Sequence, residues 1–268
     1  MKVCGIPSRK TWSILDPMNK SKLKNHLFTD SENMLDRALK HIPLGTQTFS
    51  KSLTQLPRGA APFYAERAEG SRLWDADGNE YLDFVNALCA VTLGYNDPDI
   101  DAAVQAQLKD GVSFTLPHKI EIEIAEKLCE MVPCAEKVRF GKNGSDATSG
   151  AIRIARAFTG RDRIAVCGYH GWQDWFIGST SRNLGVPQAV SDLTHTFSYN
   201  DIKSLDALFR KWPGEFAGVI MEPMNVTVPE PGFLEDVQAL CRKHGAVFIL
   251  DEMITGFRFA RGGAQELF

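Results

Sequence analysis

Residues 137–170 read KVRFGKNGSDATSGAIRIARAFTGRDRIAVCGYH, and this stretch decides the fold. Two short apolar runs, Lys137–Phe140 and Arg163–Cys167, are typical of buried strands. The segment between them, Ala147–Phe158, has the apolar period of an amphipathic helix. A strand, a helix and a second strand in succession predict two parallel strands joined by a helical crossover.

The same alternation continues towards the C-terminus. Two further apolar runs predict strands, and two amphipathic segments predict helices between them. Because parallel strands joined by helices are covered on both faces, the sequence predicts an α/β fold with a three-layer, mostly parallel sheet. The further strands are Ala217–Met221 and Ala246–Leu250, and the further helices are Asp201–Arg210 and Gly232–His244.

A different kind of segment precedes this sheet. Residues 1–30 are polar and basic, which predicts an N-terminal arm, and a short helix is expected to open at Ser31. Ser71–Phe84 reads SRLWDADGNEYLDF, in which two strand-like runs flank a turn sequence, so we expect a β-hairpin. We therefore divide the chain into residues 1–95, with arm, helix and hairpin, and residues 96–268, with the sheet.

Composition narrows the partners that we expect. The 268 residues include 30 Lys+Arg and 33 Asp+Glu, a net charge of -3, so neither a nucleic-acid nor a membrane partner is expected. The six cysteines form no CxxC pair, so we expect neither a metal site nor a disulfide scaffold. The N-terminal stretch lacks the apolar core of a secretory signal, and the expected location is the cytoplasm.

Ligands of parallel sheets bind beyond the carboxyl ends of the strands, so candidate site residues should follow each predicted strand. After the first strand, Gly141 and Gly144 allow a tight turn, and Ser145 with Asp146 opens the predicted helix. The free N–H groups at this helix start, with the Ser145 hydroxyl, would form a phosphate cradle. The pattern matches neither a dinucleotide fingerprint nor a P-loop. An ordinary strand–turn–helix junction capped by Ser145 is the alternative.

Aromatic and acidic residues follow the next two strands. Tyr169 and His170 lie between two glycines, where an aromatic ring can lie flat against a planar ligand. The alternative is an aromatic side chain in the core, with His170 hydrogen-bonded locally. Glu222 follows the third strand, where its carboxylate could orient a cofactor or cap the next loop.

Asp251 follows the fourth strand, at the end of a wholly apolar run. A lone buried carboxylate is costly, so this acid needs a partner. A protonated pyridine nitrogen would be such a partner and would act as an electron sink for carbanion chemistry. Hydrogen bonds to Thr255 or to backbone amides are the structural alternative. A phosphate cradle, a stacking aromatic and a buried acid, each after a strand, together favour a cofactor site.

These segments resemble the class III (fold type I) pyridoxal-phosphate-dependent aminotransferases, and among them the glutamate-1-semialdehyde aminomutase-like members. The resemblance runs from about Ser31 to Phe268 and rests on WDADGNEYLDF, GYNDPDIDAAV, FGKNGSDATSGAIRIARAFTGRDRI, GYHGWQDW, VIMEPMN and ILDEMITGFR. It implies an incomplete large domain of this fold and amino-group transfer between small-molecule donors and acceptors. Some such members act in sugar or polysaccharide biosynthesis, so a sugar or a small keto or aldehyde substrate fits. A homodimer with its active site between the subunits is also implied.

The resemblance also gives each candidate residue a role and implies pyridoxal 5′-phosphate (PLP) as the cofactor. Its motifs supply a phosphate-binding turn, an aromatic residue that stacks on the pyridine ring, and acids near that ring. By this resemblance the catalytic residues are Asp251 and Glu222, and the cofactor-binding residues are Asn143, Gly144, Ser145, Tyr169, His170 and Asp251.

The sequence departs from the family pattern in two places. The family's Schiff-base lysine would lie beyond Phe268, and the last lysine of this chain is Lys243. Lys142 is a poor substitute, because it would face the phosphate. In the N-terminal substrate loop, Gly45–Ser52, the aminomutases have an arginine for the substrate carboxylate, whereas this chain offers Lys51, which lacks arginine's bidentate geometry.

Two functional hypotheses follow. In the first, the chain is the N-terminal portion of an aminotransferase and is expected to be inactive by itself, because the Schiff-base lysine is absent. In the second, it is a non-catalytic truncated paralogue that dimerises or binds the cofactor weakly. A coding sequence that continues into a Gly-Lys after a short strand would favour the first hypothesis, and a stop codon would favour the second.

Overall fold

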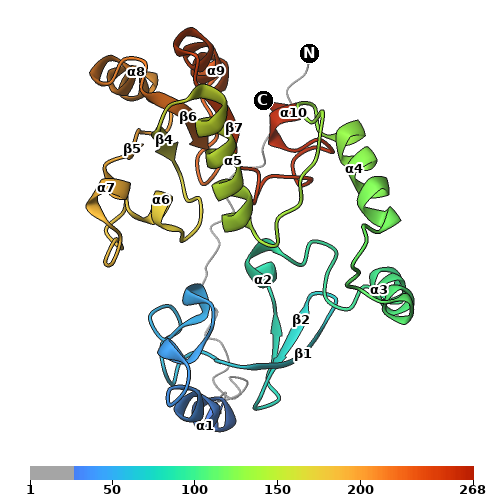
Figure 1. Ribbon diagram of the computed structural model, residues 1–268. Helices are drawn as coiled ribbons and strands as arrows, with labels where there is room; N and C mark the ends of the chain where they lie inside the picture. Colours follow the sequence, from blue (N-terminus) through green and yellow to red (C-terminus); the bar gives the residue numbers. More distant parts are fainter. Residues whose placement is uncertain (1–26) are drawn as a thin grey trace, which may run out of the picture. The chain divides into compact units, whose positions relative to one another are not determined.

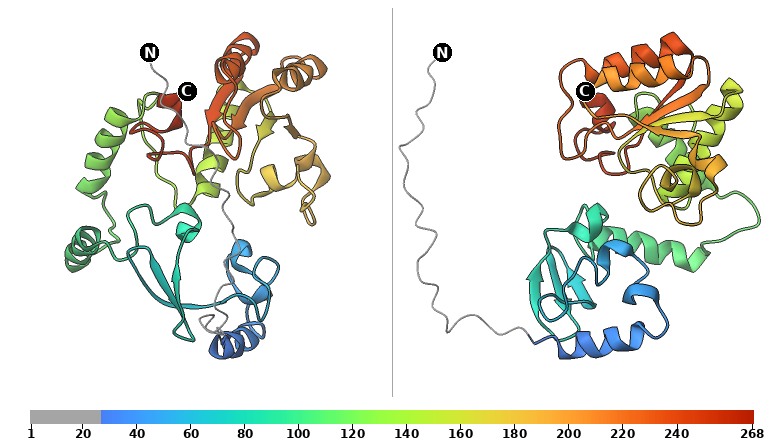
Figure 2. Two further views of the ribbon diagram at one scale, coloured as in Figure 1. Left: turned by 180° about the vertical axis from the view of Figure 1, so that it is seen from behind. Right: turned by 90° about the vertical axis from the view of Figure 1, so that its left-hand side faces the viewer.

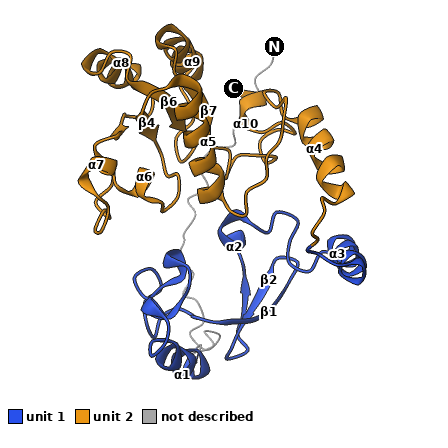
Figure 3. Ribbon diagram, viewed as in Figure 1, with its two compact units in different colours: residues 1–113 blue, residues 114–268 orange. Residues whose placement is uncertain are grey.

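The computed structural model describes residues 27–268 (Figure 1), and most of the expected N-terminal arm lies outside them. The chain divides into two compact units, residues 1–113 and 114–268 (Figure 3). Helix α3 (Pro98–Asp110) therefore belongs to the first unit, whereas our boundary at residue 95 assigned it to the second. None of the described helices is long and apolar enough to cross a membrane.

The first unit is built on a small antiparallel sheet. Its hairpin is the expected one, and one further strand pairs with it. Asp75 closes the hairpin turn: its buried carboxylate accepts hydrogen bonds from the backbone amide of Asn79 (2.8 Å) and the hydroxyl of Tyr81 (2.7 Å). The strands lie in the order β1 (Ala65–Glu69), β2 (Arg72–Asp75) and β3 (Glu80–Leu82).

The first helix begins before the residue expected from the sequence. The Asp77 carboxylate, from the hairpin turn, accepts hydrogen bonds from the amides of Asp30 (2.7 Å) and Ser31 (2.9 Å). Since this carboxylate satisfies first-turn donors, the helix needs no Ser31 cap, and Ser31 lies inside it. The helical elements are α1 (Thr29–Ala38), η2 (Pro43–Gly45), η3 (Phe49–Lys51), α2 (Asn86–Cys89) and α3.

The second unit contains the parallel sheet, whose four strands lie in the order β5-β4-β6-β7 (Figure 1). Three expected strands are present with bounds within one residue of the prediction. The three-layer, mostly parallel sheet predicted from the sequence is thereby confirmed. The strands are β4 (Arg163–Cys167), β5 (Thr194–Thr196), β6 (Phe216–Met221) and β7 (Val247–Leu250).

Helices cover both faces of this sheet (Figure 2). On one face, Ile164 of β4 packs in a core with Ile152 of α5. On the other face, Ala165 lies in a second core with Leu205 of α8 and Val237 of α9. Adjacent residues of one strand thus face opposite cores, as strand geometry requires. The helices of this unit are α4 (Lys119–Met131), α5 (Gly144–Thr159), α6 (Asp174–Ile177), α7 (Gln188–Ser191), α8 (Ile202–Lys211), α9 (Phe233–His244) and α10 (Ala264–Leu267).

One predicted strand is wrong, and one strand was missed. Lys137–Phe140 pairs with no strand of the described chain. A four-residue apolar run forms a strand only when another strand lies beside it to share ladder hydrogen bonds, and none does here. The fourth strand is instead β5, whose residues Thr194, His195 and Thr196 lack the apolar run that marks buried strands.

Candidate functional site

A cavity of about 300 Å³ lies where β4, β7 and the start of α5 come together. Strands β4 and β7 end at the same edge of the sheet because they are parallel, so the segments that follow them can meet. The cavity is lined by Asn143, Gly144, Ser145, Thr148, Tyr169, His170, Gly171, Trp172, Asp251 and Met253. All the predicted site residues except Glu222 are in this set.

The first turn of α5 faces this cavity. Asn143, rather than Ser145, is the N-cap: its side-chain oxygen accepts a hydrogen bond from the amide of Asp146 (3.0 Å). The amides of Gly144 and Ser145 precede any helical carbonyl that could accept from them, so they remain donors for a ligand. Free amides at the positive end of a helix dipole are the kind of donors that bind anions in proteins.

The acid predicted at the end of β7 is paired with the predicted histidine. The Asp251 side chain is only 8% exposed, and its Oδ2 lies 2.8 Å from Nδ1 of His170, which is fully buried. The other ring nitrogen, Nε2, lies 3.1 Å from the carbonyl oxygen of Cys167. Because a carbonyl only accepts, Nε2 is the donor there, which fixes the orientation of the ring. His170 therefore holds Asp251 in place at the floor of the cavity.

Backbone contacts hold the turn that carries His170. The Thr148 hydroxyl donates a hydrogen bond to the carbonyl oxygen of His170 (2.9 Å), which ties the turn to α5. Gly171 has φ +107° and lies so close to Ser145 that a Cβ at Gly171 would overlap the Ser145 hydroxyl. Glycine is required there for both conformation and space. The turn is thus fixed against the first turn of α5.

Two aromatic side chains line the cavity while remaining open to solvent. Tyr169 is 63% exposed and Trp172 is 71% exposed. The edge contact between Tyr169 and Phe176, with ring centroids 5.6 Å apart, supports the tyrosine ring from one side. A planar ligand in the cavity would therefore meet an available aromatic surface.

Glu222 lies outside this cavity, behind the Tyr169 turn. Its Oε1 accepts a hydrogen bond from the amide of Tyr169 (2.8 Å), and its Oε2 accepts one from the side-chain amide of Asn225 (2.6 Å). A Cβ at Gly168 would lie 2.9 Å from Oε1, so the acid is packed against the backbone. These contacts fix Glu222 against the backbone of the Tyr169 turn, and the catalytic role implied by the resemblance stays a prediction.

Two groups near Glu222 stay neutral. Burial, reinforced by the Glu222 charge, raises the pKa of the Cys167 thiol to about 11. Burial, together with the neighbouring Cys167 and Glu222, raises the pKa of Tyr199 to about 12. The Tyr199 hydroxyl donates a hydrogen bond to the Pro223 carbonyl (2.6 Å). Because the nucleophilic form of cysteine is the thiolate, Cys167 is a structural residue at neutral pH.

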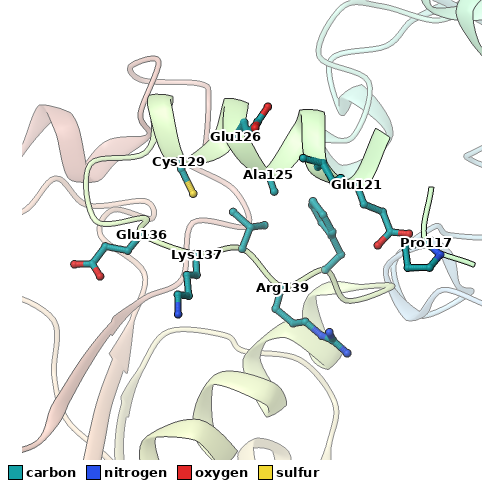
Figure 4. Close-up of a pocket in the computed structure, with 11 residues that line it drawn as sticks. Pro117, Glu121, Ala125, Glu126, Cys129, Glu136, Lys137 and Arg139 are labelled. Atoms are coloured by element: carbon teal, nitrogen blue, oxygen red, sulfur yellow. The ribbon is translucent and has the colours of Figure 1, made fainter. Parts of the chain in front are cut away.

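A larger cavity, of about 760 Å³, lies between α4 and the extended segment that follows it (Figure 4). Ala125 and Cys129 of α4 line one side, and Lys137 and Arg139 line the other. None of the predicted site residues lies there. We therefore place the candidate site at the smaller cavity, where the predicted phosphate cradle and the buried acid converge.

Sequence reasoning missed four residues that line the site: Thr148, Gly171, Trp172 and Met253. Gly171 and Trp172 lie in the quoted GYHGWQDW motif, and Thr148 is one helical turn after Gly144, so each carried a positional signal. Met253 carried none, because its contact with Gly144 joins two distant segments. Of the lysines considered above, Lys142 is exposed and outside the lining set, and Lys51 lies in η3 of the first unit.

The fold and the site define an α/β protein in which the free amides of a helix start and a buried acid share one cavity. Residues 55–266 match the sequence model of the aminotransferase class-III family, and the chain therefore belongs to that family. Members of this family use pyridoxal phosphate as the cofactor for amino-group transfer.

Solved structures agree with this assignment. An omega-transaminase from Sphaerobacter thermophilus is 36% identical, with a TM-score of 0.80 over 88% of this chain and 57% of that one. The FumI protein of Sphingopyxis sp. MTA144, in its PLP internal aldimine form, is 33% identical, with a TM-score of 0.80 over 86% of this chain and 56% of that one. The chain thus spans little more than half the length of these proteins.

The likeness to glutamate-1-semialdehyde aminomutase is limited to the fold. The aminomutase from Pseudomonas aeruginosa PAO1 is 24% identical, with a TM-score of 0.76 over 90% of this chain and 55% of that one. At this identity the shared fold carries no information about substrate. The aminomutase-like specificity implied by the resemblance therefore receives no support beyond the fold.

The residues present fit PLP. Its phosphate is an anion, for which the Gly144 and Ser145 amides are donors. Its pyridine ring is planar and fits the open face of Tyr169. Its ring nitrogen, when protonated, requires an acceptor. Asp251 Oδ2 already accepts a hydrogen bond from His170, and Oδ1 accepts one from the Met253 amide (3.0 Å). Because a carboxylate oxygen can accept two hydrogen bonds, each oxygen can still accept one from the ring nitrogen.

Proposed function

We propose that this chain provides the cofactor-binding part of a PLP-dependent aminotransferase. The observation that carries the proposal is the convergence of the α5 amides and the Asp251–His170 pair on one cavity. When bound, PLP supplies an electron sink for the electron pair left at the reacting carbon of the substrate. The activity, substrates and partners of the whole protein are part of this proposal.

Each residue of the site has a defined task. Gly144 and Ser145 bind the phosphate through their amides, and Asn143 keeps those amides in place by capping the helix. Asp251 accepts a hydrogen bond from the protonated ring nitrogen and so keeps the proton there. His170, fixed at both ring nitrogens, holds the Asp251 carboxylate in position.

The aromatic side of the site sets the plane of the ring. Tyr169 covers one face of the pyridine ring, and its amide is held by Glu222. The Glu222 carboxylate accepts from both Tyr169 and Asn225, so it fixes the backbone of the turn without touching the ring. In this way Tyr169 and Glu222 would together fix the plane of a bound pyridine ring.

Amino transfer between a small amino donor and a keto or aldehyde acceptor is the reaction we propose, in preference to an aminomutase reaction. The identity to the omega-transaminase is higher than the identity to the aminomutase. The loop Gly45–Ser52 also lacks an arginine for bidentate carboxylate binding.

We also propose a homodimer. Helix α3 exposes an apolar row, Ile100, Val104 and Leu108, each about half accessible to solvent. Such a row at a spacing of four residues is a surface that a second subunit can cover. Sedimentation equilibrium checks this: a monomer at micromolar concentration contradicts it, and Val104→Glu should weaken any dimer.

Binding of pyridoxamine 5′-phosphate tests the cofactor assignment without requiring a covalent link. We expect the protein to bind this compound more tightly than pyridoxamine, because the α5 amides bind the phosphate. Ser145→Asp places a negative charge in the cradle and should weaken binding of the phosphate ester at least about tenfold, an effect of ~1.4 kcal/mol. Ser181→Asp, at an exposed turn outside the cavity, is the matched control. Equal affinity for both compounds contradicts the proposal.

A further inference from the structure

Glu252 follows Asp251 directly, and its carboxylate is unusually well satisfied. It lies outside the set of cavity-lining residues, and the four donors that surround it all come from the segment that follows. These donors are the Thr255 hydroxyl (2.7 Å), the Ala264 amide (2.7 Å), the Gln265 amide (2.9 Å) and the Gln265 side-chain amide (3.1 Å).

The surroundings of this carboxylate are buried. Thr255 is 1% exposed and Ala264 is fully buried. Gly263, at φ +88°, lies so close that a Cβ there would overlap the Glu252 carboxylate. An ionised carboxylate accepts only, so four donors suit the charged form of Glu252 and fix its orientation. The hydrogen bonds to this carboxylate thus join the two ends of the loop formed by residues 252–265.

The next residue connects this loop to the site. The Met253 amide donates a hydrogen bond to Oδ1 of Asp251 (3.0 Å). The Met253 methyl group lies against the α5 N-terminus, where a Cβ on Gly144 would overlap it. Met253 thus contacts the acid through its backbone and the phosphate cradle through its side chain. Its placement depends on the anchored loop that begins at Glu252.

From these contacts we propose that Glu252 is a positioning residue of the cofactor site, which acts through Asp251 and Met253. Because Glu252 fixes the loop next to Met253, the Met253 side chain stays against the α5 N-terminus. The Met253 amide likewise stays hydrogen-bonded to Asp251. The effect on cofactor rests on the function proposed above, whereas the placement of Met253 is a property of the free protein.

The alternative is a merely structural role, in which Glu252 stabilises the loop without influencing the cavity. Glu252→Gln separates the two roles, since an amide presents an NH₂ group to at least one of the four donors. Glu266→Gln is the matched control: Glu266 directly follows this loop and accepts from the Gly262 amide, and it makes no hydrogen bond to Asp251 or Met253.

The experiment uses protein labelled with ¹³C at its methionine methyl groups, with the Met253 signal assigned from Met253→Leu. In the free protein, Glu252→Gln should shift and narrow the Met253 signal, because the methyl group leaves its contact with Gly144, whereas Glu266→Gln should leave it unchanged. Below the melting temperature of both variants, Glu252→Gln should also weaken binding of pyridoxamine 5′-phosphate about tenfold. Glu266→Gln should not.

The two readouts separate the two proposals. An unchanged Met253 signal in Glu252→Gln overturns the positioning role, whatever the binding data show. A shifted signal with unchanged affinity overturns the effect on the cofactor and leaves Glu252 as a residue that positions Met253 only. If the parent protein binds no pyridoxamine 5′-phosphate, the cofactor assignment fails, and the methyl signal still decides whether Glu252 positions Met253.

Discussion

His170 Nδ1 lies 2.8 Å from Asp251 Oδ2, although 81 residues separate the two along the chain. One residue follows β4 and the other follows β7, and β6 lies between these strands in the sheet. The His170 side chain is fully buried, and the Asp251 side chain is 8% exposed. A paired, buried acid at this edge is what a cationic ring nitrogen requires, and the same pairing couples the stability of two distant segments.

This coupling predicts a non-additive effect on stability. Asp251→Ala leaves a buried histidine without its partner and should lower the free energy of unfolding by about 3–5 kcal/mol. In the double variant with His170→Phe, the loss should be smaller than the sum of the two single losses by about 1–3 kcal/mol. Urea denaturation of the four proteins measures the cycle. Additive losses would show that the 2.8 Å contact carries no coupling.

Asp251 should also separate binding from chemistry. In a complete enzyme that contains this chain, Asp251→Ala should lower amino transfer more than about a hundredfold, since a hydrogen bond to a charged ring nitrogen is lost and the electron sink fails. Some cofactor should stay bound, because the Gly144 and Ser145 amides hold the phosphate separately. Turnover and cofactor content are measured on the same preparation. Near-normal turnover in the variant would exclude the electron-sink role.

The contact between Gly168 and Glu222 predicts a second stability effect. Gly168 has φ +107°, and an added Cβ would lie 2.9 Å from Glu222 Oε1. Gly168→Ala should therefore cost about 2–4 kcal/mol, from backbone strain and displacement of the acid. Gly185, at φ +87° with nothing within 4 Å of a Cβ, is the control, and Gly185→Ala should cost only about 1 kcal/mol. Equal losses in thermal unfolding would mean that the Glu222 contact adds nothing.

Much of the fold could be predicted because buried parallel strands are marked by uninterrupted apolar runs. β4, β6 and β7 carry such runs and were predicted within one residue. β5 was missed because an edge strand of Thr-His-Thr has no apolar signal. Lys137–Phe140 was predicted wrongly, because composition favours an extended chain but cannot supply the neighbouring strand that a ladder needs.

The candidate site shows the same limit. Asp251 could be found because it follows the strand β7, and topology brings such positions to one edge of the sheet. Ser145 could be found from the glycine turn and helix start that surround it, although the strand predicted before that turn is absent. The role of Glu222 could not be read in this way, since its distance from the cavity depends on how its side chain turns toward the Tyr169 amide. Met253 was missed because nothing local indicates that it packs against Gly144.

His195 predicts a pH dependence of stability on the sheet edge away from the site. Burial lowers the pKa of His195 below its usual value, and the charges of Arg163 and Lys211 lower it further, against the opposing charges of Asp192 and Glu215. Arg163 Nη1 lies 2.8 Å from His195 Nε2, which accepts from it only when the ring is neutral.

The sign follows from proton linkage. Below the ordinary histidine pKa, about 6.5, the unfolded chain takes up a proton that the folded chain does not. The contribution of His195 is therefore complete above about pH 7 and is lost as the pH falls below 6.5. Chemical denaturation between pH 7.5 and about pH 5 gives the free energy of unfolding as a function of pH. The slope of this plot reports the protons taken up on unfolding, and His195→Gln should reduce it by up to one proton. His41→Gln, in the first unit, is the control, and an unchanged slope in His195→Gln contradicts the prediction.

The last prediction concerns the covalent link to the cofactor. The residues that line the described cavity include no lysine. Lys142 is exposed beside the N-cap, and Lys243, the last lysine of the sequence, lines a different cavity between α8 and α9. We therefore expect the 268-residue polypeptide to bind PLP without a lysine adduct at the site and to transfer no amino group by itself.

Borohydride reduction followed by peptide mapping checks this expectation. Reduction in the presence of excess PLP should label surface lysines to a small and equal extent, with no single lysine labelled stoichiometrically, because no amine reaches the aldehyde carbon from within the cavity. Lys142→Arg should leave the pattern otherwise unchanged. Stoichiometric labelling of Lys142, lost in Lys142→Arg together with any measurable amino transfer, would mean that this lysine reaches into the cavity and forms the link. That result would overturn the expectation of inactivity while leaving the phosphate cradle and the Asp251–His170 pair in their proposed roles.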